Sequence, residues 1–235
     1  GVTSAATAIT ISAAGIVTLV DDLLLKDACT IGTATTAGAI SIAADGTVNL
    51  ATAGATVNSV AAKVAGTETM WIPAASMYPN TTAGCAALAQ VELSNGPEIK
   101  VLDFDASSDE NAQFAVAFPK SWNEGTVTFQ AFFTVTGTNT GTTAWGLSAV
   151  ALADDGSLNT AFGTNVVATA KAHSGTSNDL DVSAVSGAVT IAGSPSVNEY
   201  VFFQIMRDVS ADDQSGDARL LGIKLFFTTD AANDA

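Results

Sequence analysis

Positive charge is scarce in this 235-residue chain. Eight Lys and Arg stand against 23 Asp and Glu, which gives a formal net charge of −15. A surface of this sign repels nucleic acid and anionic membrane, because binding to either depends on a basic footprint. No apolar run approaches the 18 residues of a membrane-spanning helix, and no signal-peptide pattern opens the chain. We therefore expect no nucleic-acid partner and no membrane partner.

Histidine and cysteine are rarer still. The one histidine, His173, lies in a Ser/Thr/Gly-rich stretch typical of an exposed loop, and a Gly-x-Ser-x-Gly turn is missing. A hydrolytic triad is therefore excluded. The two cysteines, Cys29 and Cys85, lie 56 positions apart without the paired spacing of a zinc site. Two small buried thiols are expected, with a disulfide left open. We predict no enzymatic activity and no cofactor.

Carboxylates, in contrast, gather in two clusters. The first comprises Asp103, Asp105, Asp109 and Glu110, and the second comprises Asp212, Asp213 and Asp217. Two carboxylates are all that a glycosidase needs, and carboxylate oxygens also bind calcium. The first cluster lacks the glycine and the bidentate glutamate of an EF-hand loop. The second remains a weak calcium candidate, and ionised turn carboxylates are the default expectation for both.

Two of the few cations, Arg207 and Arg219, flank the second cluster. We expect them to pair with Asp208, Asp213 or Asp217. Such a pair would order the loop more than it would stabilise the fold.

Aromatic residues and prolines are absent from residues 1–70, whereas all 16 aromatics and all five prolines lie between Trp71 and Ala235. A change this sharp predicts a domain boundary. We place a β-repeat stalk or attachment region at residues 1–68 and a β-sandwich head at residues 69–235.

The first region contains an internal repeat. Residues 9–19 align without gaps on residues 40–50, with six of eleven positions identical. Apolar and polar residues alternate in both units, and Gly15 or Gly46 stands between the two short apolar segments. This period-two pattern predicts two β-hairpins, and Asp45-Gly46 is a strong turn signal.

Each predicted hairpin has one stripe of small aliphatic side chains, and an isolated hairpin is marginal in water. Three copies wound about a common axis would bury these stripes together and would close the assembly. We therefore expect an intertwined homotrimer, although the repeat alone does not dictate three copies. The expected trimer core consists of Ile9, Ile11, Val17, Leu19, Ile40, Ile42, Val48 and Leu50.

The second region has turn signals every eight to twelve residues and lacks a 12-residue amphipathic helix. This pattern predicts an all-β sandwich, with a jelly roll favoured. Aromatic residues at strand spacing are expected to be chiefly core, namely Phe129, Phe132, Phe133, Trp145, Phe202, Phe203, Phe226 and Phe227. The expected strands are residues 99–104, 112–118, 126–136, 144–153, 166–170, 188–191, 200–207 and 219–228.

Both regions resemble parts of tailed-phage structural proteins, notably those of marine phages. The first resembles the Ile-Thr-Ile-x-x-Asp-Gly-x-Val stalk repeats of fibre proteins. The second is similar to a head domain of such proteins, through Trp71-Ile72-Pro73-Ala74, Met77, Leu102-Asp103-Phe104-Asp105, Phe118-Pro119-x-x-Trp122, Ala144-Trp145, Arg207-Asp208, Asp213, Asp217, Ala218 and Gly222. The resemblance implies a trimeric virion component.

Three functions follow as hypotheses. The leading one is a non-enzymatic spike, short fibre or capsid decoration on the virion surface, with itself and other virion proteins such as capsid or tail as partners. The alternative is a receptor- or glycan-binding tip that binds a host surface glycan. Exposed aromatics beside Asp or Asn on one rim would favour this alternative, because sugars stack on rings and hydrogen-bond to such groups. The third is a β-sandwich subunit of a cell-surface filament.

Overall fold

A computed structural model of the chain describes residues 29–31, 40–50, 56–57, 60–61, 65–231 and 234. The chain divides into two units, Gly1–Ala62 and Lys63–Ala235. The predicted boundary between residues 68 and 69 falls inside strand β6 (Gly66–Pro73), which belongs to the second unit. Within the described ranges, helices long and apolar enough to cross a membrane are absent.

The first unit contains a three-stranded antiparallel sheet in the order β1-β2-β3. The hairpin expected over residues 40–50 is present, with Ile40 opposite Leu50 and Ile42 opposite Val48. Its turn is closed by a hydrogen bond from Gly46 N to Ala43 O at 3.0 Å. Gly46 has a φ of +85°, a conformation that glycine adopts at little cost. The strands of this unit are β1 (Cys29–Ile31), β2 (Ile40–Ile42), β3 (Val48–Leu50), β4 (Thr56–Val57) and β5 (Val60–Ala61).

The predicted trimer core is only partly within the described residues. Ile40 and Ile42 are partly buried within one chain, and Val48 is 59% exposed. Ile9, Ile11, Val17 and Leu19 lie outside the described residues, as does the side chain of Leu50. The trimer stays a prediction.

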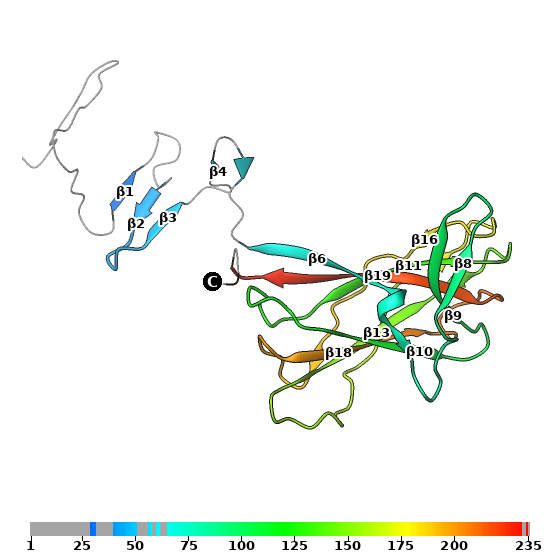
Figure 1. Cartoon of the computed structure of the whole chain (residues 1–235). Coiled ribbons are helices and arrows are strands. Elements are labelled where there is room, and N and C mark those ends of the chain that lie inside the picture. Colours follow the sequence, from blue (N-terminus) through cyan, green and yellow to red (C-terminus); the bar gives the residue numbers. More distant parts are fainter. Residues whose placement is uncertain are drawn as a thin grey trace, which may run out of the picture. The chain divides into compact units, whose positions relative to one another are not determined.

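The second unit is a β-sandwich (Figure 1). Eight of its strands follow the orders β10-β18-β13-β14 and β9-β19-β11-β16, and successive strands mostly alternate between the two sheets. This connectivity is that of a jelly roll, as predicted. The eight strands are β9 (Glu98–Phe104), β10 (Glu110–Val116), β11 (Thr128–Val135), β13 (Trp145–Leu152), β14 (Val166–Val167), β16 (Asp181–Val182), β18 (Tyr200–Arg207) and β19 (Ala218–Thr229).

Shorter elements extend both sheets. We call the sheet β14-β13-β18-β10-β7, with β17 parallel to β13, the β18 sheet; the sheet β16-β11-β19-β9-β8, with β6 beside β19, is the β19 sheet. Strands β12 and β15 form a separate two-stranded sheet. The bounds are β7 (Tyr78–Pro79), β8 (Ala89–Glu92), β12 (Thr142–Thr143), β15 (Lys171–Ala172), β17 (Ile191–Ala192) and the short 3₁₀ helix η1 (Ala74–Ser76).

The core between the two sheets is rich in aromatic side chains. Trp145 meets Phe104 edge-on with ring centroids 5.0 Å apart, and Phe114 stacks on Phe203 at 5.1 Å. All four side chains are at most 1% exposed. Each such side chain contributes about 1.5–3 kcal/mol by burial.

Three aromatics expected in the core lie on outer faces instead. Phe132, Phe202 and Phe226 are only partly buried, whereas the residue that follows each of them is at most 4% exposed. The physical reason is the alternation of a strand, which sends neighbouring side chains to opposite faces of the sheet. Only one member of each Phe-Phe pair can therefore reach the core.

Candidate functional site

The outer face of the β18 sheet carries a row of aromatic and amide side chains. Along β18, Val201, Phe203 and Ile205 are fully buried, so Tyr200, Phe202 and Gln204 point outward. Gln204 lies opposite Gln113 of β10, and Gln113 lies opposite Tyr78 of β7. Directly paired residues share a face of a sheet. We call these five outward residues the tyrosine face: Tyr78, Gln113, Tyr200, Phe202 and Gln204.

The two tyrosines are half exposed, with 48% of Tyr78 and 49% of Tyr200 accessible to solvent. The ring of Tyr200 meets the ring of Phe202 edge-on, with centroids 4.7 Å apart. Burial, and secondly the Tyr200 phenol, raise the pKa of Tyr78 above its ordinary value. Tyr78 therefore presents a flat apolar ring and a protonated hydroxyl that can donate and accept hydrogen bonds.

An amide cluster lies beside Tyr78. The Nδ2 group of Asn80 donates a hydrogen bond to Oε1 of Gln204 at 2.8 Å, and Nε2 of Gln113 donates to the same oxygen at 3.3 Å. The Oδ1 atom of Asn80 is buried and accepts no hydrogen bond from the described residues.

Three hollows run across this face and share lining residues. The first, of about 280 Å³, is lined by Tyr78, Asn80 and Gln113 among others. Gln113 also lines the second, of about 110 Å³, together with Phe202 and Leu158. Leu158 then continues into the third, of about 570 Å³, which ends at Tyr200, Asn198 and Asp154. Because Gln113 borders the first two hollows and Leu158 borders the last two, the hollows follow one another along the face, and we call this series the track.

The loop between β13 and β14 forms one wall of this track. Leu158, Thr160 and Phe162 of this loop line the second hollow beside Val150 of β13. Leu158 is 76% exposed, the largest exposed fraction among the large apolar side chains of the described residues. The track therefore combines apolar surface with a few amides and hydroxyls, which is the usual composition of a ligand site.

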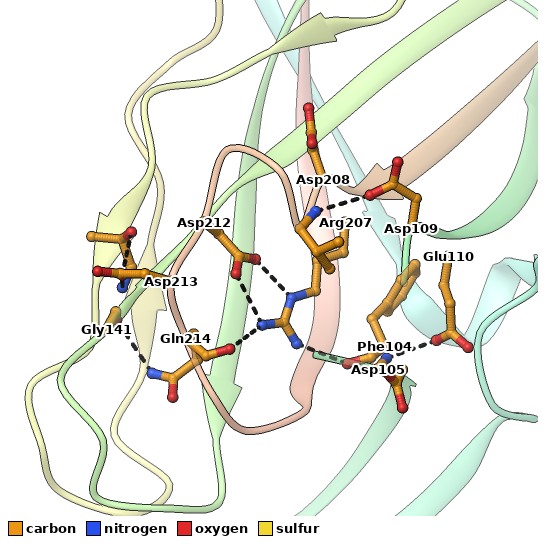
Figure 2. A network of polar contacts seen from close by, with 12 residues as sticks. Phe104, Asp105, Asp109, Glu110, Gly141, Arg207, Asp208, Asp212, Asp213 and Gln214 are labelled. Carbon is orange, nitrogen blue, oxygen red and sulfur yellow. Dashed lines mark hydrogen bonds and ion pairs between the residues drawn. The ribbon is translucent and has the colours of Figure 1, made fainter. Parts of the chain in front are cut away.

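The acidic loop predicted as a weak calcium candidate is used differently (Figure 2). Nε of Arg207 lies 2.8 Å from Oδ2 of Asp212, and both side chains are almost fully buried. The guanidinium also donates to the backbone oxygens of Phe104, Gly216 and Gln214 at 2.8–3.0 Å. The expected partners of Arg207 were wrong, because the loop curls back so that Asp212 meets the guanidinium.

The other two carboxylates of this cluster do not join Asp212. Asp213 accepts hydrogen bonds from the backbone N–H and the hydroxyl of Thr142, which lower its pKa, and Asp217 is exposed. Among the described residues, groups of three or more potential metal ligands are absent. The structure therefore does not assemble Asp212, Asp213 and Asp217 into one site.

The first acidic cluster is likewise dispersed. Asp103 pairs with Arg219 at 3.1 Å, which corrects the expected partners of that arginine. Burial raises the pKa of Asp103 and outweighs the opposing effect of Arg219. Asp109 accepts from the backbone N–H of Val209, and Glu110 accepts from that of Asp105. These carboxylates hold loops in place.

The expectation of an exposed histidine was wrong. His173 is 3% exposed, and its Nδ1 lies 2.6 Å from Oδ2 of Asp181, itself 2% exposed. Lys171 approaches the same carboxylate at 3.7 Å. Cys85 is buried and free, as expected of a structural thiol, and burial raises its pKa to about 12. A thiol with this pKa is protonated near neutral pH and is a poor nucleophile.

Family models and curated sequences that match this chain were not found. Among solved structures, carbohydrate-binding modules match part of this chain. A family 6 module of a laminarinase from Zobellia galactanivorans has 16% identity and a TM-score of 0.34, over 67% of this chain and 98% of that module. A family 11 module from Clostridium thermocellum, in complex with a mixed-linked tetrasaccharide, has 9% identity and a TM-score of 0.38, over 70% and 96%. These values do not place the chain in either family and carry no information on its ligand.

Proposed function

We propose that the second unit is a non-catalytic carbohydrate-binding head that binds an uncharged polysaccharide along the tyrosine face. The observation that carries this proposal is the joined track from Tyr78 to Tyr200, with an amide cluster at one end. Sugar rings present flat C–H faces to aromatic side chains and hydroxyl groups to amides. The tyrosine face offers both kinds of contact.

The shape and charge of the track indicate the class of glycan. In the sheet ladder Tyr78 lies two strands and four positions from Tyr200, which puts their Cα atoms roughly 16 Å apart at ordinary strand spacings, so a ligand that reaches both residues is longer than one sugar unit. Asp154 is the one charged residue that lines the three hollows. A linear, uncharged chain suits such a surface better than an ionic ligand.

The lining also supports binding without cleavage. Glycoside hydrolysis requires two carboxylates flanking the scissile bond, and the track supplies one. This proposal favours the glycan-binding tip over a purely mechanical spike. Placement on a phage virion, the homotrimer and the other virion partners remain predictions from the sequence resemblance, which microscopy of a particle carrying this chain would test.

Affinity electrophoresis through gels containing neutral β-glucans, xylan, mannan or galactan tests the proposal. The wild-type chain is expected to be retarded by at least one of them, and Tyr78→Ala or Tyr200→Ala to weaken binding about tenfold. Tyr200→Phe keeps the ring and should bind nearly as well. Leu180→Ala changes a residue that is 60% exposed and lies beside β16 of the β19 sheet, and should have no effect. Wild-type binding by both alanine variants, or no retardation on any glycan, would overturn the proposal.

A further inference from the structure

The outer face of the β19 sheet carries a second set of exposed aromatic side chains. Trp71 of β6 lies opposite Lys224 of β19, which lies opposite Gln130 of β11, so the three form one row across neighbouring strands. Trp71 is 47% exposed, whereas Trp122 and Trp145 are at most 1% exposed. We call five outward residues the tryptophan face: Trp71, Gln130, Phe132, Lys224 and Phe226.

A glycine leaves room for the indole of Trp71. Gly222 of β19 lies opposite Phe132, and a Cβ atom at Gly222 would come within 2.7 Å of the Trp71 ring. Because this space is free of a side chain, the rings of Trp71 and Phe132 meet across β19, edge-on with centroids 5.3 Å apart. Trp71 is therefore supported from below and from one side, and the rest of its ring stays open to solvent. A rigid, half-exposed ring loses little entropy when a ligand stacks on it.

The charge of the tryptophan face is opposite to that of the whole chain. Lys224 Nζ lies 5.1 Å from the centroid of the Phe132 ring and forms no salt bridge with the described residues. The face has no carboxylate among its five members, while the chain as a whole has a net charge of −15. At physiological ionic strength charges beyond roughly 8 Å are largely screened, so Lys224 dominates the field at the adjacent indole.

We propose that the tryptophan face is a second sugar-binding site, which binds a sugar residue bearing a carboxylate or sulfate group. The apolar face of the sugar stacks on Trp71, and its anionic group pairs with Lys224, whose Cβ lies about 5 Å from that of Trp71 as a cross-strand neighbour. This site is distinct from the tyrosine face because it lies on the other sheet of the sandwich.

Contact with a second copy of the chain is the competing explanation for an exposed aromatic surface. The centres of protein interfaces are depleted in charged residues. A self-complementary contact centred on this row would bring two Lys224 ammonium groups together. An anionic sugar neutralises the same ammonium, so charge complementarity favours the sugar.

Calorimetric titration with oligogalacturonate, with its carboxyl-reduced neutral counterpart and with a sulfated galactan oligosaccharide tests this proposal. At least one anionic oligosaccharide is expected to bind, and its binding should weaken with rising salt. If the uronate is the ligand, carboxyl reduction should abolish its binding. Trp71→Ala and Lys224→Gln should each weaken it about tenfold, whereas Lys224→Arg should retain most of it.

Variants of the two faces separate this proposal from the first. Tyr200→Ala should leave anionic binding unchanged, and Trp71→Ala should leave neutral-glycan binding unchanged. The proposal is overturned if neither anionic oligosaccharide binds, or if Trp71→Ala and Lys224→Gln bind as well as the wild type. It is also overturned if light scattering shows that Trp71→Ala dissociates an oligomer, since the face would then be an interface between copies.

Discussion

Arg207 and Asp212 form an ion pair in which neither side chain is more than 2% exposed, although the acidic loop that contains Asp212 lies at the surface. Three backbone carbonyls accept the remaining N–H groups of the guanidinium. The arginine thereby ties the loop to the end of β9 and to β18 (Figure 2).

Arg207→Met should therefore be severely destabilising, because it leaves Asp212 as an unpaired buried charge and leaves the three backbone carbonyls without their hydrogen-bond donor. We expect the free energy of unfolding to fall by about 3–5 kcal/mol, measured by urea denaturation. Arg219→Met is the matched control. Its pair with Asp103 is roughly a quarter exposed, so a loss of at most about 1 kcal/mol is expected. Equal losses for the two variants would contradict this interpretation.

Substitutions at Phe202 and Phe203 should distinguish a residue that contacts ligand from a residue that packs in the core. Phe203→Ala should cost about 3–5 kcal/mol of stability, because Phe203 is fully buried against Phe114. Phe202→Ala should cost far less, yet it removes part of the wall of the second hollow and should weaken glycan binding. Thermal unfolding and affinity electrophoresis of both variants check this, and a reversed order of stabilities would show that the assigned faces are wrong.

Gly222→Ala should displace the indole of Trp71. The new Cβ would lie 2.6 Å from the carbonyl oxygen of Ile72 and 2.7 Å from the Trp71 ring, so β6 and β19 must move apart. Since Trp122 and Trp145 are buried, quenching of tryptophan fluorescence by iodide reports chiefly on Trp71 and should increase. Gly66→Ala is the control on β6, because its added Cβ would meet no atom within 4 Å. Unchanged quenching in Gly222→Ala would contradict the role given to this glycine.

Two carboxyl groups should show opposite pH dependence. The Thr142 N–H and hydroxyl lower the pKa of Asp213, so its contribution to stability is present above the unfolded value of about 3.9 and is lost as pH falls through the lower folded value. Burial raises the pKa of Asp103, so its contribution instead declines as pH rises from about 3.9 through the raised folded value. The loss of stability caused by Asp213→Asn should thus be largest above pH 4. The stability of Asp103→Asn relative to the wild type should rise as pH rises. Carboxyl titrations by NMR give both signs directly, and the same sign for both would refute the assignment.

The N-terminal repeat, together with the resemblance to phage fibre proteins, predicts a closed trimer. Light scattering of the whole chain should give three times the mass of one chain, and Ile11→Asp or Ile42→Asp should release monomers or prevent folding, because an unpaired buried charge is costly. Thr47→Asp, in the exposed hairpin turn, is the matched control. A stable wild-type monomer at micromolar concentration would remove the trimer hypothesis.

Although the eight-residue strand β6 was not expected, the sequence by itself determined the all-β class, the hairpin at residues 40–50 and the positions of six long strands. These features are local. Period-two alternation and an Asp-Gly turn act over a few residues, and the long strands β9, β10, β11, β13, β18 and β19 lie within about two residues of their expected bounds. The same alternation indicated that the two members of each Phe-Phe pair lie on opposite faces. The expectation that all these aromatics lie in the core overlooked this signal.

Only the tertiary structure decided which residues meet. Tyr78 joins Tyr200 on one face because β7 and β18 both pair with β10, and Trp71 meets Phe132 because β6 and β11 flank β19 at a glycine. His173 is buried because the chain around it folds back so that the ring meets Asp181. Such pairings join residues far apart along the chain or depend on the exact path of a loop. They are decided by the burial of the whole sandwich, because local preferences do not specify which strand edges or loops come together.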